Sequence, residues 1–123
     1  MINATDTPLI AVTLFALWTA LLAISVPIWR IILVASGLAR TTDFTPGEAH
    51  GSPVYWRLNR AHVNAAENLA IFAALTIAGI ASGLTDAMFG QLCLIAAGAR
   101  ILESLIHIAS GASVAIVARF IAF

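Results

Sequence analysis

Residues 9–35 form an almost uninterrupted run of apolar side chains, and this run restricts the fold more strongly than any other feature of the sequence. About 20 such residues in a helix span the hydrocarbon core of a bilayer. The run is too long for the apolar core of a signal peptide, and no basic segment precedes it. We therefore expect a first transmembrane helix that is tilted or extends beyond the hydrocarbon, with Pro27 bending it.

The composition supports a membrane protein along the whole chain. Hydrophobic residues make up 61% of the 123 residues and charged residues only 10%, whereas soluble domains carry about 25% charged residues. The net charge is zero and lysine is absent, so nothing points to nucleic acid or to a polybasic tail. The single cysteine excludes an internal disulfide, and the three histidines show no metal-ligand spacing, so no metal site is expected.

The chain reads as one domain, residues 1–123, of an all-α integral membrane protein with four helices. We expect these helices at about residues 9–39, 55–82, 87–108 and 112–123. Glycine and proline interrupt the chain between residues 36 and 56, and short turns follow residues 82 and 109. The last segment is too short to span a bilayer, so it is a stub, an interfacial piece or a truncated fourth helix.

The arginines predict the orientation of this multi-pass chain. Arg40, Arg57 and Arg60 lie in or beside the first loop, and the second loop has no basic residue. The positive-inside rule therefore places the first loop in the cytoplasm and the N-terminus outside. The start of the second helix and the end of the third then lie at the same depth, on the cytoplasmic side.

A polar stripe marks the start of the second helix. At about 100° per residue, its members fall within a sector of roughly 100°, and His62 points to the opposite side. A membrane helix tolerates such a stripe only where it faces protein or water, so the stripe is a functional-site hypothesis. Its members are Arg57, Arg60, Asn64, Glu67 and Asn68.

A second polar cluster ends the third helix. Arg100, Glu103, Ser104 and His107 are spaced to share one helix face. Since both clusters are expected at the same depth, they can meet. Two interpretations stay open for the residues of both clusters: a buried network of ion pairs between helices, or a ligand-binding site.

Residues 60–68, Arg-Ala-His-x-Asn-x-x-Glu-Asn followed by Phe72, resemble the helix-two signature of the MAPEG family, the membrane-associated proteins in eicosanoid and glutathione metabolism. Further segments are similar to family motifs: Ser36-Gly37-x-x-Arg40, the arginine at position 57, residues 99–102 and Arg119-Phe120. The resemblance covers about residues 10–123. It points to bacterial members of the microsomal glutathione transferase type.

The resemblance implies a homotrimer of four-helix protomers that binds glutathione between neighbouring protomers at the cytoplasmic side. It implies a transferase or peroxidase acting on lipophilic electrophiles, with lipids and lipophilic small molecules as partners. Arg119 is the implied catalytic residue, which would stabilise the thiolate of glutathione. The implied glutathione-binding residues are Arg40, Arg57, Arg60, Asn64, Glu67, Arg100 and His107.

The chain also departs from the family pattern. Ala65 replaces an aspartate, Ile71 replaces a frequent proline, and Glu103 and His107 occupy positions often held by histidine or tyrosine. Binding is therefore better supported than turnover. The alternative function is a non-catalytic protein of this type that binds lipid or partner proteins, or an accessory subunit of a larger membrane complex.

Two further side chains have their own interpretations. Arg30, inside the first apolar run, has no family counterpart; it snorkels to the interface or pairs with an acidic residue. Cys93 is expected to be a small apolar packing residue.

Overall fold

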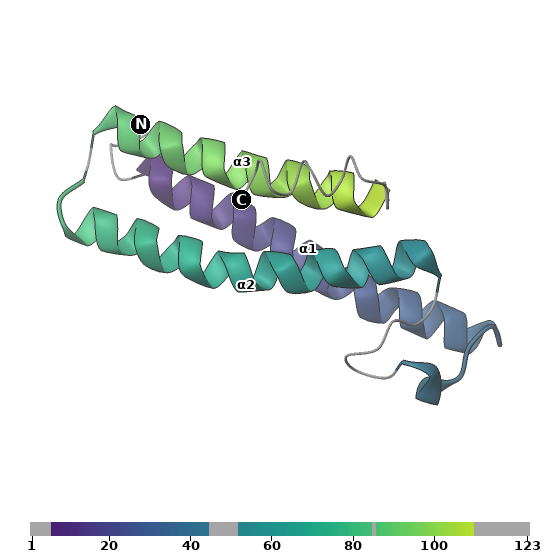
Figure 1. The fold of residues 1–123 in the computed structure, drawn as a ribbon. Coiled ribbons are helices and arrows are strands. Elements are labelled where there is room, and N and C mark those ends of the chain that lie inside the picture. The colour runs from purple at the N-terminus through teal and green to yellow at the C-terminus, as the bar shows by residue number, and fades with distance from the viewer. Residues whose placement is uncertain (1–5, 45–51, 85, 110–123) are drawn as a thin grey trace.

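The computed structural model of the protein describes residues 6–44, 52–84 and 86–109, which form three long helices (Figure 1). These are α1 (Asp6–Ala35), α2 (Pro53–Ala81) and α3 (Ala87–Ala109), with a short 3₁₀ helix η1 (Thr41–Asp43) after α1. Each long helix is long and apolar enough to cross a membrane. The expected fourth segment, residues 112–123, lies outside the described residues.

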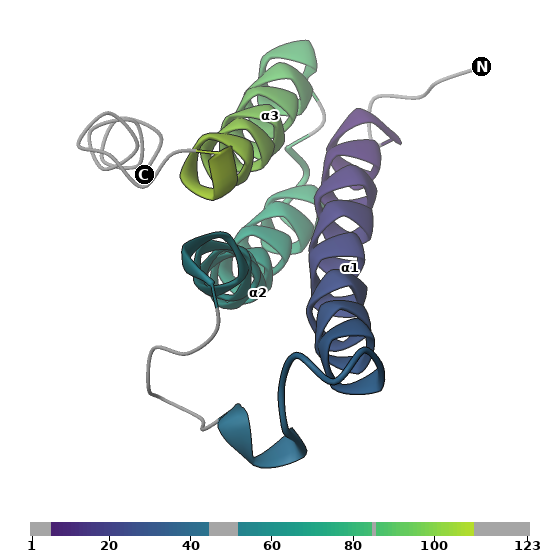
Figure 2. The same ribbon diagram turned by 90° about the vertical axis from the view of Figure 1, so that its right-hand side faces the viewer.

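The three helices pack against one another in all pairs. Seen near the bundle axis, they occupy the corners of a triangle (Figure 2). Because the turn between α2 and α3 is short, these two helices run antiparallel. The start of α2 and the end of α3 therefore lie at the same end of the bundle, where the two polar clusters reside.

Local chemistry sets the helix ends. Ser52 caps α2 by accepting a hydrogen bond from the Tyr55 N–H, and Pro53 occupies the first turn. The first helix ends at Ala35, four residues before the expected position 39. The reason is Gly37, whose φ of +76° turns the chain out of the helix.

The same turn ends α1 and α2. After α1, the N–H of Leu38 donates to the carbonyl of Leu33 at 2.9 Å, and the N–H of Gly37 donates to Val34 at 3.1 Å. This pair of bonds defines a Schellman motif, which satisfies carbonyls that the helix leaves open. Gly83, with a φ of +90°, makes the corresponding turn after α2.

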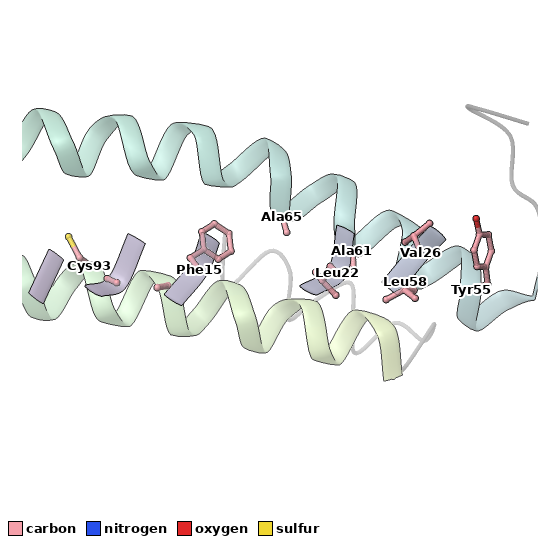
Figure 3. Close-up of a cluster of buried hydrophobic side chains, with 10 residues drawn as sticks. Phe15, Leu22, Val26, Tyr55, Leu58, Ala61, Ala65 and Cys93 are labelled. Carbon is pink, nitrogen blue, oxygen red and sulfur yellow. The ribbon is translucent and has the colours of Figure 1, made fainter. Parts of the chain in front are cut away.

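The core is a narrow seam between the three helices (Figure 3). Large side chains come mainly from α1, where Phe15, Leu22 and Val26 are buried. Towards the middle of the bundle the facing residues of α2 are small, Ala61 and Ala65, whereas Tyr55 and Leu58 near the start of α2 are large and buried. Most other large apolar side chains are exposed, as in a bundle whose outer surface contacts lipid rather than water.

Two glycines near the α2–α3 turn lie at close contacts. A Cβ on Gly90 would lie 3.0 Å from the Cβ of Thr7 on α1, and a Cβ on Gly79 would lie 2.6 Å from Cζ of Phe89. Glycine at these positions lets the helices approach closely, as is common in membrane bundles. Cys93 lies in the core 3.9 Å from the Thr76 hydroxyl, where it acts as a small packing residue.

Candidate functional site between α2 and α3

The polar stripe of α2 divides along its length into an inner and an outer edge. Asn64, Asn68 and Arg57 form the inner edge; they are half-buried. Arg60 and Glu67 form the outer edge and are exposed. On the helical wheel the outer edge lies farthest from the buried alanines of α2, so it faces away from the three-helix core.

The inner edge is hydrogen-bonded to α3 through Glu103. Nδ2 of Asn64 donates to the two carboxylate oxygens of Glu103 at 3.1 and 3.4 Å, and Glu103 is only 4% exposed. Asn68 supports Asn64 by donating to its backbone carbonyl at 2.7 Å. From the sequence, Glu103 is expected on the polar face of the third helix, because it lies three residues after Arg100. It is not among the predicted ligand-binding residues.

Arg57 joins the same two helices closer to their ends. Its Nε donates to the backbone carbonyl of Ile108 at 3.0 Å. This carbonyl belongs to the last turn of α3, where helix carbonyls have no partner within the helix. A positive charge at this end is also favourable for the helix dipole, so Arg57 acts as a cap of α3.

The outer edge consists of two opposite charges two helical turns apart. Within the described part of the chain, neither Arg60 nor Glu67 has a hydrogen-bond or ion-pair partner. Glu67 lies about 21 Å along α2 from Pro53, at about 1.5 Å per residue, so it is not at the helix end. A charge at this depth needs protein, ligand or water beside it.

The other predicted site residues are placed differently. Arg100 and His107 are half-buried on α3, close in sequence to Glu103. Arg40 is exposed beside η1, where its backbone N–H donates to the Asp43 carboxylate at 2.8 Å, and no bond among the described residues joins it to the stripe. Arg119 lies outside the described residues.

His62 faces away from the stripe, as expected from the wheel. It is half-buried, and its Nδ1 has no hydrogen-bond partner among the described residues. The described residues also contain no group of three His, Cys, Asp or Glu side chains arranged for a metal ion.

The described residues form three apolar helices of membrane-spanning length, with a polar site between two of them. These features define an integral, multi-pass helical membrane protein. The model of the MAPEG family matches residues 9–123. The chain therefore belongs to the MAPEG family, as the sequence resemblance predicted. No curated protein and no solved structure shows a significant match to the chain.

Proposed function

We propose that this protein binds glutathione between neighbouring protomers of a homotrimer, at the cytoplasmic side, and acts on lipophilic electrophiles. Membership of the MAPEG family supports this proposal. The observation that carries it is the outer edge of α2, where Arg60 and Glu67 are exposed and have no partner among the described residues.

The charges of this edge complement those of glutathione, which carries two carboxylates and one amine. The guanidinium of Arg60 suits a carboxylate because it can donate two parallel hydrogen bonds. The carboxylate of Glu67 suits the amine. The two residues are seven positions apart, about 10.5 Å along the helix, and an extended tripeptide spans about 10–11 Å. The two charges thus match the two ends of the ligand.

The inner edge has a positioning role in this proposal. The Asn64–Glu103 and Arg57–Ile108 hydrogen bonds fix the rotation of α2 against α3. This rotation directs Arg60 and Glu67 outward, toward the surface that a second protomer would cover. A homotrimer is consistent with this geometry, because a neighbouring protomer would shield both charges from lipid.

When bound, glutathione supplies a thiol as the nucleophile. A guanidinium beside a thiol favours the thiolate, and Arg119 remains our candidate for this role. Arg100, Arg40 and His107 remain candidates for the other contacts with the ligand. The first-loop end of the bundle is cytoplasmic in this proposal, where the positive-inside rule places it.

The direct test is calorimetric titration of the detergent-solubilised protein with glutathione at millimolar concentration. Arg60→Ala and Glu67→Gln should each weaken binding at least tenfold. Arg30→Gln and Asp86→Asn, which remove a charge elsewhere, are the matched controls and should bind like the wild type. Wild-type protein that binds no glutathione contradicts the function, and full binding by both site variants contradicts the site.

One observation favours the second function, a non-catalytic binding protein or an accessory subunit. Glu103 occupies a position where the family often has histidine or tyrosine, and here its carboxylate is bonded to Asn64 inside the protomer. A binder would take up glutathione or lipid without turnover. Two assays distinguish the enzyme from the non-catalytic binding protein: thiolate absorbance on glutathione binding, and transfer of glutathione to a chloronitrobenzene. The enzyme should give both signals, whereas the binding protein should show no transfer. Stoichiometric co-purification with another membrane complex, without transfer, would identify the accessory subunit.

A further inference from the structure

A tyrosine and a phenylalanine surround Arg30, near the end of α1. The Nε of Arg30 donates a hydrogen bond to the Tyr55 hydroxyl. Its guanidinium carbon lies 5.3 Å from the ring centre of Phe44 and 5.9 Å from that of Tyr55. These distances are typical of cation–π contacts. Since no carboxylate among the described residues pairs with Arg30, its positive charge is not neutralised there.

Beside this guanidinium the surface is hollowed. The hollow has a volume of about 450 Å³ and is open on one side. It contains one charged side chain and no acidic one, and the remaining lining is apolar except for a threonine. The lining residues are Arg30, Ile31, Val34, Ala35, Thr41 and Phe44.

If α1 is centred in the bilayer, its length places the hollow near the depth of lipid headgroups. Arg30 lies about 14 Å from the midpoint of α1, counted at 1.5 Å per residue. The edge of a hydrocarbon core about 30 Å thick lies about 15 Å from its centre. A centred α1 thus places the guanidinium at the boundary between acyl chains and headgroups. Ile31, beside it, is 65% exposed.

We propose that this hollow binds the phosphate of an anionic phospholipid. A guanidinium has five N–H donors, and only Nε of Arg30 is used within the described chain. The Phe44 and Tyr55 rings hold the guanidinium in place, so little side-chain freedom is lost when the phosphate binds. Zwitterionic lipids bind less well because the lining offers no carboxylate to their ammonium group. The site is separate from the proposed glutathione site on the outer edge of α2.

Fluorescence quenching of Trp29 tests this proposal in the reconstituted full chain. Trp29 neighbours Arg30, and its ring centre lies 6.0 Å from that of Tyr55. A Trp18→Phe/Trp56→Phe background leaves Trp29 as the one remaining tryptophan of the three in the sequence. Phosphatidylcholine vesicles then receive a small fraction of acyl-brominated phosphatidylglycerol or, for comparison, acyl-brominated phosphatidylcholine.

The brominated anionic lipid should quench Trp29 with about a fivefold higher apparent affinity, since one arginine near an anionic surface contributes about that factor. Arg30→Gln should reduce the ratio to about one. Ala35→Phe should do the same by filling the hollow while Arg30 stays, which keeps the test valid if Arg30→Gln misfolds. Arg40→Gln, an equal charge change outside the hollow, should retain the preference.

Three results would overturn the proposal. One is equal quenching by the two lipids in the starting background. Another is a loss with Arg40→Gln as large as the loss with Arg30→Gln, which would indicate general surface attraction. The third is relief of quenching by inorganic phosphate at constant ionic strength, which would indicate a site for small anions; unchanged quenching supports the lipid.

Discussion

The contact between Asn64 and Glu103 provides the sharpest test of how α2 and α3 are joined. One amide nitrogen reaches both carboxylate oxygens, at 3.1 and 3.4 Å, and only the shorter distance is that of a good hydrogen bond. Hydrogen bonds to charged groups contribute about 1.5–3 kcal/mol in soluble proteins. In membrane proteins the measured coupling averages about 0.6 and reaches about 1.7 kcal/mol. Because Glu103 is buried and Asn64 is itself supported by Asn68, we expect about 1 kcal/mol.

A double-mutant cycle measures this energy. The free energy of unfolding is obtained by denaturant titration in mixed micelles for the wild type, Asn64→Ala, Glu103→Ala and the double variant. Each single change should cost about 1–3 kcal/mol because it removes a hydrogen bond between a buried carboxylate and a half-buried amide. The double variant should lose about 1 kcal/mol less unfolding free energy than the sum of the losses in the two single variants.

The control cycle pairs Asn64→Ala with Gln91→Ala. Gln91 is exposed near the opposite end of α3, so these two effects should add within about 0.3–0.5 kcal/mol. A coupling energy between Asn64 and Glu103 as small as that of the control would refute the reasoning. The polar contact would then contribute nothing measurable to the α2–α3 interface.

Three more predictions concern other contacts of the bundle. Gly90→Ala should lower the melting temperature relative to Gly98→Ala, because a Cβ meets α1 at the first position and nothing at the second; equal shifts would contradict the close packing. Tyr55→Phe should cost about 1 kcal/mol in unfolding titrations, since it removes the acceptor for Arg30 and keeps the ring; an unchanged midpoint would count against that bond. Arg57→Gln should increase hydrogen exchange in the last turn of α3 by about fivefold, the equivalent of about 1 kcal/mol, and unchanged exchange would show that it does not cap the helix.

The helices were predictable because their signals are local. Apolar runs longer than about 20 residues indicate spans, and the ends of α2 and α3 lie within two residues of the expected positions. The error at the end of α1 has a local cause as well. The expected end at residue 39 lies beyond Gly37, whose positive φ ends the helix before it.

The division of the polar stripe was not predictable from the wheel alone. The wheel groups Arg60 with Asn64, but it does not fix how the helix is rotated against its neighbours. That rotation depends on which small residues pack against α1 and α3, and Ala61 and Ala65 are those residues here. Contacts between segments far apart in the sequence determine the rotation of α2. Local sequence patterns therefore do not predict which side of the stripe faces outward.

The Arg30–Tyr55 contact also depends on segments that are far apart in the sequence. The two residues lie on different helices, and the path between them includes the turn at Gly37 and η1. From the sequence, Arg30 is expected to snorkel to the interface or to pair with an acidic residue. Within the described residues the structure gives a tyrosine hydroxyl and two aromatic rings instead. Nothing in the sequence around Tyr55, two residues after Pro53, indicates this role.

The turns at Gly37 and Gly83 have a consequence for how the chain tolerates variation. A Cβ at either position would meet no atom within 4 Å, so space alone permits any residue. Their positive φ values forbid most of them, because an L side chain in this region costs about 1–2 kcal/mol. A mutational scan would therefore find two exposed positions where most substitutions are destabilising, with asparagine as the mildest replacement. Surface exposure is thus a poor guide to mutational freedom where these two helices end.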